Sequence, residues 1–209
     1  MVKIVRGTID AVFKYRFNIC TPIRYLSDLQ IDQSIEKRFW RSWKRFYQRS
    51  EPLISDYRQE RFEAFFRQLE RDGSDERYCR RIEIRFINPK VGFGVFAKEF
   101  IPPYSTLNHY AGILMLDREI KSNHDSTFSF TDLKNYSIDA MKAGNWTRFI
   151  NHGNEKNPKT NAIPWETYLE NIGPRIVLTA GPHGIKPREQ ILYSYGDSYW
   201  EGKRKAASL

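Results

Sequence analysis

The first regular pattern in the chain is an alternation of apolar and polar side chains close to the N-terminus. Every second residue is apolar in the run Phe13, Tyr15, Phe17 and Ile19. A repeat of two residues is typical of a half-buried strand. Residues 2–5 are also mostly apolar and would pair with this strand across Gly7. The pattern therefore predicts a short N-terminal hairpin.

Apolar side chains then recur at helical spacing in two segments. They are Ile35, Phe39, Trp43 and Phe46 in the first segment, and Phe62, Phe65, Phe66 and Leu69 in the second. Ser27 and Gln30 have the spacing of a capping box, so the first helix is expected over residues 29–49, with an interruption at Pro52. The second helix is expected over residues 56–71, ending before Gly73. Together they predict a helical hairpin whose aromatic side packs on the rest of the chain.

The first of these helices carries many more basic than acidic residues. The basic residues are Lys37, Arg38, Arg41, Lys44, Arg45 and Arg49, and Glu36 is the one acid among them. Two interpretations stay open for this charge. It is either a solvated helix face, or a surface that contacts phosphate groups or a protein partner.

From residue 81 onward the pattern is that of short strands separated by glycine and proline turns. Strands are expected at residues 82–86, 95–97, 107–113, 136–139 and 175–179, with an insertion over 116–135 and an ambiguous segment at 165–172. Many short strands with little helix predict a mostly β domain over residues 75–200. A flanking region, residues 1–74, supplies the hairpin and the two helices, and residues 201–209 form a basic tail. The fold class is α+β overall.

Composition narrows the class of protein. The chain has 209 residues, 34 basic against 25 acidic, and a net charge of +9, which allows an anionic partner. No apolar stretch is long enough for a membrane span or a signal peptide. We therefore expect an intracellular location, in the cytoplasm or nucleus, and an effector that acts in a host cell is also compatible. The two cysteines are expected to be reduced thiols, and the scattered histidines give no zinc site.

The most distinctive stretch is residues 145–153, in which an apolar pair precedes Asn151 and His152. An amide next to an imidazole offers hydrogen-bond donors and acceptors side by side, which suits the edge of a purine ring. A simple turn is the alternative for an isolated Asn-His-Gly.

Two further blocks flank this stretch. Residues 92–97 read Gly-Phe-Gly-Val-Phe-Ala and are followed by Tyr110, and residues 185–196 end in Tyr193-Ser194-Tyr195-Gly196. In this order and spacing the three blocks resemble the SET-domain protein lysine methyltransferases, over residues 81–200. The resemblance implies a SET-type fold of small curved sheets with a threaded C-terminal segment. It also implies S-adenosylmethionine as cofactor.

The resemblance assigns roles to particular residues. Those expected to bind the cofactor are Gly92, Phe93, Gly94, Arg148, Phe149, Asn151 and His152. Tyr195 corresponds to the catalytic tyrosine, Tyr110 to a tyrosine of the lysine channel, and Tyr193 to the residue that controls how many methyl groups are added. No metal is implied. Gly153 departs from the family pattern, which usually has serine there. The aromatic pair Tyr199-Trp200 is expected either to close the channel or to pack in the core.

Three hypotheses for the function follow. The first is methyl transfer to a lysine of a histone or another protein, mainly monomethylation with some dimethylation. The second is a degenerate SET fold that serves as a protein- or chromatin-binding module. The third is a nucleic-acid-binding protein driven by charge, although no known nucleic-acid module is present. The expected partners are a protein substrate, nucleosomal DNA through the basic surface, and a second copy of the chain through the N-terminal region.

Overall fold

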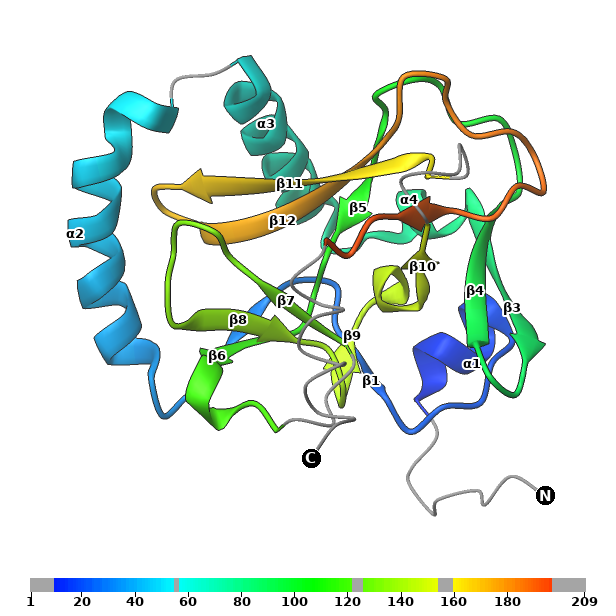
Figure 1. Ribbon diagram of the computed structural model, residues 1–209, viewed down its shortest axis with the longest axis horizontal. Coiled ribbons are helices and arrows are strands. Elements are labelled where there is room, and N and C mark those ends of the chain that lie inside the picture. Colours follow the sequence, from blue (N-terminus) through cyan, green and yellow to red (C-terminus); the bar gives the residue numbers. More distant parts are fainter. Residues whose placement is uncertain (1–9, 55–56, 122–125, 154–159, 197–209) are drawn as a thin grey trace.

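The computed structural model describes residues 10–54, 57–121, 126–153 and 160–196 (Figure 1). Its helices are α1 (Ala11–Phe17), α2 (Glu36–Ile54), α3 (Tyr57–Asp72) and α4 (Glu76–Cys79), with the 3-10 turns η1 (Asp117–Glu119) and η2 (Trp146–Phe149). Its first strands are β1 (Arg24–Tyr25), β2 (Gln30–Ile31), β3 (Ile82–Asn88), β4 (Gly92–Ala97), β5 (Thr106–His109), β6 (Ile113–Leu116) and β7 (Thr127–Ser129). The later strands are β8 (Tyr136–Asp139), β9 (Ala143–Gly144), β10 (Asn151–His152), β11 (Ala162–Leu169), β12 (Gly173–Ala180) and β13 (Leu192–Tyr193).

These strands form several small sheets rather than one large one. One sheet has the order β11-β12-β5 and another the order β2-β6-β8-β7, while β3 pairs with β4. Two further pairs, β1 with β9 and β10 with β13, are parallel and join segments that are far apart in the sequence. The predicted α+β class, dominated by short strands, is confirmed.

The N-terminal strand prediction is wrong, because residues 11–17 form the helix α1. The carboxylate of Asp10 caps this helix by accepting the backbone N–H groups of Val12 and Phe13, at 2.9 and 3.2 Å. Phe13 and Phe17, four residues apart, are both buried, whereas Tyr15 is 81% exposed. Phe13 and Phe17 therefore lie on the buried face of a helix, at a spacing that also fits a strand. The N-cap from Asp10 favours the helix over the strand. The other half of the predicted hairpin, residues 2–5, lies outside the described residues.

The predicted start of the first long helix is also wrong. Residues 30–31 form β2, which pairs in parallel with residues 113–114 of β6, and α2 begins only at Glu36. The helix then continues through Pro52 to Ile54. Only two residues follow the proline, so its missing N–H removes one hydrogen bond from the last turn. The second helix, α3, is confirmed, and it ends at Asp72, directly before Gly73, whose φ of +61° favours glycine.

Helices α2 and α3 flank β11 and β12 (Figure 1). Phe39 and Trp43 of α2 belong to one apolar cluster with Tyr110, Leu114, Ile138, Tyr168 and Ile176. Phe62, Phe65 and Phe66 of α3 pack with Leu169 and Val177. The aromatic side of the helical hairpin is therefore covered by the chain's own sheets. The domain division after residue 74 stays a prediction, although residues on both sides of it share these clusters.

The strand predicted over residues 107–113 is interrupted. β5 ends at His109 and β6 begins at Ile113, so Tyr110 lies in the break between them. Gly112 sits against β8, where an added Cβ would be 2.7 Å from the backbone oxygen of Asp139. The close approach of the two backbones explains why a residue without a Cβ stands here. It also places Tyr110 between two sheets, and the other strands predicted after residue 81 are confirmed within a few residues.

The C-terminal part of the described chain lies between β4 and β10 (Figure 1). On one side, the backbone N–H of Ile191 donates to the oxygen of Val95 at 2.8 Å. On the other side, β13 pairs with β10 through Leu192 opposite Asn151 and Tyr193 opposite His152. This arrangement brings together the three sequence blocks at residues 92–97, 145–153 and 185–196.

Candidate functional site

The glycine turn and the Asn-His pair meet directly. The Nδ2 group of Asn151 donates to the backbone oxygen of Phe93 at 3.0 Å. A Cβ added at Gly94 would be 2.6 Å from Cδ1 of Ile87 and 3.1 Å from Nδ2 of Asn151. Gly92 has a φ of +77°, in the left-handed region. The sequence motif thus creates a bare stretch of backbone held against the amide of Asn151.

An aromatic wall lies beside this turn. The rings of Phe93 and Phe149 are in edge contact, with centroids 5.7 Å apart. Arg148 lies over the Phe149 ring at 4.8 Å, while its Nε donates to the oxygen of Ala140 at 2.7 Å. Its second guanidinium nitrogen donates to Oγ of Ser126 at 2.9 Å. Arg148 is therefore fixed by the protein itself.

The charge of Arg148 acts on two tyrosines. Burial lowers the pKa of Arg148, and its interactions with Tyr110, Asp139 and Tyr195 act in the opposite direction. The guanidinium thus interacts electrostatically with Tyr110 and Tyr195, two of the three tyrosines predicted from the sequence. A positive charge at this position disfavours a second cation nearby.

His152 and Tyr195 are joined by two contacts. The backbone N–H of Tyr195 donates to Nδ1 of His152 at 3.2 Å, and the two rings have centroids 5.4 Å apart. Because Nδ1 accepts a hydrogen bond, the neutral imidazole carries its proton on Nε2. The hydroxyl of Tyr195 donates to the backbone oxygen of Ile150 at 2.7 Å. The terminal tyrosine is thus tied to the Asn-His strand at both its backbone and its side chain.

The three predicted tyrosines belong to one continuous aromatic cluster. Centroid distances are 5.6 Å from Tyr110 to Phe128, 6.0 Å from Phe128 to Tyr193, and 5.0 Å from Tyr193 to Tyr195. Tyr110 and Tyr193 are 3% and 5% exposed. Phe128 links the two sides of the cluster, and sequence reasoning did not select it as a site residue. It lies within the insertion expected over residues 116–135, where no motif marked its partners.

Gly153 replaces serine for a steric reason. A Cβ at this position would be 2.7 Å from Oγ1 of Thr160 and 3.0 Å from Cβ of Leu192. The backbone N–H of Gly153 also donates to the oxygen of Tyr193 at 2.9 Å. The departure from the usual pattern therefore allows the C-terminal segment to approach β10 closely.

A neighbouring amide holds the C-terminal segment from the other side. Nδ2 of Asn161 donates to the oxygen of Gln190, and Oδ1 of Asn161 accepts the N–H of Leu192, both at 2.9 Å. Asn161 was not among the site residues predicted from the sequence. Its two bonds give it a clear structural role, which is to fix the segment that carries Tyr193.

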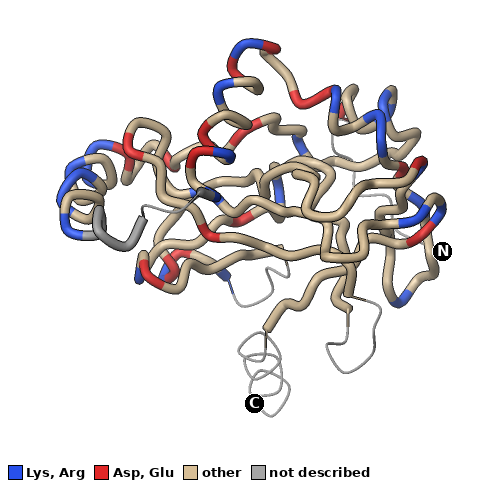
Figure 2. The backbone as a smooth tube through the Cα atoms, turned by 90° about the horizontal axis from the view of Figure 1, so that it is seen from above, with Lys and Arg blue, Asp and Glu red and all other residues tan. Residues whose placement is uncertain are grey.

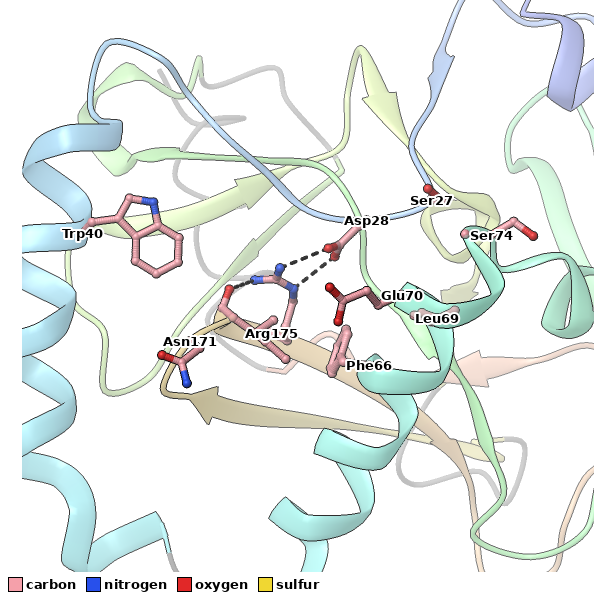
Figure 3. A pocket seen from close by; sticks show the side chains of 11 residues that line it. Ser27, Asp28, Trp40, Phe66, Leu69, Glu70, Ser74, Asn171 and Arg175 are labelled. Carbon is pink, nitrogen blue, oxygen red and sulfur yellow. Dashed lines mark hydrogen bonds and ion pairs between the residues drawn. The ribbon is translucent and has the colours of Figure 1, made fainter.

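A separate polar network is built around the hydrogen-bonded pair Asp28 and Arg175, near α3 (Figure 3). The fully buried His109 contacts the rings of Phe65 and Phe66, and its Nε2 is 3.1 Å from Oδ1 of Asp28. Arg175 donates to both carboxylate oxygens of Asp28 at 3.1 and 3.2 Å. Burial alone would raise the pKa of Asp28, but the close contact with His109 and the charge of Arg175 outweigh it, so this pKa is lowered.

Beside this network is a cavity of about 540 Å³ between α2, α3 and the turn from β11 to β12 (Figure 3). Its lining includes Trp40, Phe66, Glu70 and Asn171 together with Asp28 and Arg175. None of these residues was predicted as part of a site. None of the residues of the tyrosine cluster lines this cavity.

The described residues contain no group of three or more side chains suited to hold a metal ion. Cys20 is exposed and Cys79 is buried, and both are free thiols. No helix within the described ranges combines the length and apolar character needed to cross a membrane.

Small sheets, a glycine turn against an Asn-His strand, and a buried tyrosine cluster define the class of protein. Residues 92–196, half of the chain, match the family model of the SET domain. The chain belongs to the SET domain family, and the SET-type fold is confirmed.

Relatives and solved structures support this assignment. Histone-lysine N-methyltransferase EHMT1 of Homo sapiens is 32% identical over 126 residues, which are 56% of this chain and 9% of that protein. A SET domain-containing protein of Phaeosphaeria nodorum is 36% identical over 76 residues, 36% of this chain and 11% of that protein. The chain thus spans about a tenth of the length of these curated relatives.

One solved structure covers most of the chain. ATXR5 in complex with histone H3.1 has a TM-score of 0.63 at 19% identity, over 90% of this chain and 84% of that one. This likeness extends the shared fold beyond the matched family segment to the N-terminal helices.

Proposed function

We propose that this protein is an S-adenosylmethionine-dependent protein lysine methyltransferase. The observation that carries the proposal is the meeting of three sequence blocks at one place, where Asn151 contacts Phe93 and Tyr195 contacts both Ile150 and His152. Support also comes from the 32% identity to a relative named histone-lysine N-methyltransferase.

The residues present fit the cofactor. S-adenosylmethionine, when bound, supplies a methyl group on a positively charged sulfur. The backbone at Gly92 and Gly94 has no side chain that would block a ligand, and Asn151 and His152 offer an amide and an imidazole beside it. Phe93 and Phe149, with Arg148 above the latter, would form the apolar wall.

The tyrosine cluster would receive the lysine side chain. A lysine must lose its proton before it can act as a nucleophile. Burial among Tyr110, Phe128 and Tyr193 disfavours the ammonium form, and the nearby charge of Arg148 acts in the same direction. The channel residues thus favour the neutral amine.

The role of Tyr195 follows from its hydrogen bond. Because its hydroxyl proton is donated to the oxygen of Ile150, the phenolic oxygen can accept a hydrogen bond from the amine. This positions the amine rather than deprotonating it. Orientation of this kind is itself a large contribution to rate, because a well-held pair of reactants no longer has to meet by diffusion.

Tyr193 would limit the number of methyl groups added. It is buried between Phe128 and Tyr195, where its hydroxyl occupies space that further methyl groups would need. We therefore propose mainly monomethyl-lysine as product, with some dimethyl-lysine.

The proposed substrate is a lysine of a histone or of another protein inside the cell, in cytoplasm or nucleus. Contact with nucleosomal DNA belongs to the same proposal. Pairing of two chains through the N-terminal region stays a prediction. The argument for it, the aromatic side chains of the N-terminal helices, is weaker than the sequence suggested. Phe39, Trp43 and Phe62 are buried against the chain's own sheets, so these side chains are not available to a partner.

The experiment is a transfer assay with radiolabelled S-adenosylmethionine and core histones, alongside calorimetric titration of the cofactor. We expect labelled protein and measurable cofactor binding. Binding without transfer would favour the alternative, a SET fold kept as a binding module. Absence of both would refute the proposal.

A further inference from the structure

The outer side of α2 is a row of basic side chains. Six of them are exposed: Lys37, Arg38, Arg41, Lys44, Arg45 and Arg49. They appear as a concentration of blue on the helix at the left of Figure 2. The opposite side of the helix carries Phe39 and Trp43, which are buried in the core. From residue 37 to residue 49 the row is about 18 Å long.

Several arginines elsewhere in the described chain form ion pairs with a nearby glutamate. Arg67 pairs with Glu63 at 3.3 Å, and Arg80 pairs with Glu76 at 2.6 Å. Arg81 pairs with Glu99 in the same way. For the six basic residues of α2, the described part of the structure holds no ion pair or hydrogen bond of their side chains. The positive charge of α2 is thus left uncompensated by the fold.

A cavity at the start of this row adds a second observation. It has a volume of about 440 Å³ and lies between α2 and η1. Its lining includes Arg38, Ser42, Arg118 and Asn135, which all bear hydrogen-bond donors. The carboxylate of Asp117, also in the lining, accepts the hydroxyl of Ser137 at 2.6 Å. Two guanidinium groups with a hydroxyl and an amide match the oxygens of a phosphate.

We propose that the outer face of α2, together with Arg118, binds the phosphate backbone of duplex DNA without sequence preference. A duplex presents one negative charge for about every 1.7 Å of its axis, so a straight basic row meets several phosphates at once. A membrane surface is a poorer match. Surface-bound helices insert an apolar face, and the apolar face of α2 is already packed against the sheets.

The test uses the full chain and a fluorescent 20-base-pair duplex of arbitrary sequence, with anisotropy measured in a series of salt concentrations. The triple variant R38Q/R41Q/R45Q should bind at least about tenfold more weakly, and the slope of log affinity against log salt should fall by about 3. The matched control, R67Q/R71Q/R80Q, removes the same charge from α3 and from the residue that follows α4, and should stay within about twofold of the unmodified protein.

Two further measurements test the role of Arg118 and whether DNA binding is independent of methyl transfer. Arg118→Gln alone should lower the salt slope by about 1, because it removes one phosphate contact at the cavity. Methyl transfer to a short free peptide should be the same for the α2 triple variant and the unmodified protein, which separates this inference from the proposed activity.

Several outcomes would overturn the inference. One is the absence of DNA binding by the unmodified protein at low salt. Another is an equal loss in both triple variants, which would mean that net charge alone matters. Tighter binding to vesicles rich in phosphatidylserine, or to duplex RNA, would assign the surface to a different partner.

Discussion

The hydroxyl of Tyr195 donates a 2.7 Å hydrogen bond to the backbone oxygen of Ile150, the residue directly before the Asn-His pair. One bond therefore connects the end of the described chain to the strand that would hold the cofactor. Because the hydroxyl proton is used in this bond, the phenolic oxygen of Tyr195 is left as a hydrogen-bond acceptor for a substrate.

The variant Tyr195→Phe tests this relationship. It keeps the ring contacts with Tyr193 and His152 but deletes the bond to Ile150, so the free energy of unfolding should fall by about 0.5–1.5 kcal/mol. Cofactor binding should persist while methyl transfer is mostly lost. Urea unfolding, calorimetry and the transfer assay give the three readings. Full turnover by the variant would remove Tyr195 from the site.

Asn151→Ala should weaken binding of S-adenosylmethionine. The side-chain amide of Asn151 donates a hydrogen bond to the backbone oxygen of Phe93. Its removal would leave both this oxygen and the ligand without a hydrogen-bond partner, at a cost of about 1–3 kcal/mol. Calorimetric titration measures the loss. Asn171→Ala, in the separate cavity beside Arg175, is the control and should bind the cofactor as the unmodified protein does. An equal effect of both changes would argue against a direct role for Asn151.

Tyr193→Phe should change the product rather than abolish it. The ring keeps its stacking with Phe128, at 6.0 Å and 22°, while the hydroxyl that limits the pocket is gone. Mass spectrometry of a methylated substrate should show a shift from monomethyl-lysine towards dimethyl- and trimethyl-lysine. Mainly trimethyl-lysine from the unmodified protein would contradict this role.

Gly153→Ser should destabilise the protein although it restores the usual family residue. The new Cβ would lie 2.7 Å from Oγ1 of Thr160, and overpacking of this kind costs about 1–3 kcal/mol. The double variant G153S/T160A removes the nearest atom and should recover part of the loss in a urea titration. If the single variant is as stable as the unmodified protein, the close approach of Leu192 and Thr160 to Gly153 does not exclude a side chain at this position.

The two thiols should react differently. Burial, and then the negative charge of Asp75, raise the pKa of the Cys79 thiol to about 12. Because the thiolate is the reactive form, Cys79 stays inert at pH 8, while the exposed Cys20 reacts. A thiol reagent should therefore label one cysteine in the native protein and two after denaturation. The raised pKa stabilises the fold below the pKa of an unfolded cysteine, and this contribution is lost as the pH rises towards 12.

The sequence predicted α3 well because Phe62, Phe65, Phe66 and Leu69 repeat in a way that only a helix satisfies. It failed at α1, where four alternating residues fit a strand equally well and the cap from Asp10 decided the outcome. A pattern of apolar residues distinguishes a helix from a strand only when just one of the two would bring all these residues to the same face.

The site shows the same limit. Asn151, His152 and Tyr195 could be found because they stand in blocks with a recognisable order. Phe128 could not be predicted as a site residue, because its contacts with Tyr110 and Tyr193 depend on the packing of segments that are far apart in the sequence. The backbone oxygen of Ile150 has no sequence signature at all, since every residue has one.

The position of residues 185–195 between β4 and β10 has a consequence for biosynthesis. Asn151 meets its strand partner, Leu192, only after forty further residues have been made, and contacts of such long range form late. A growing chain on the ribosome can build its helices and most of its sheets while its candidate site still lacks one wall. A chain that stopped before residue 191 would fold in part but lack this wall of the candidate site, so a premature stop codon late in the message should abolish the proposed methyl transfer completely.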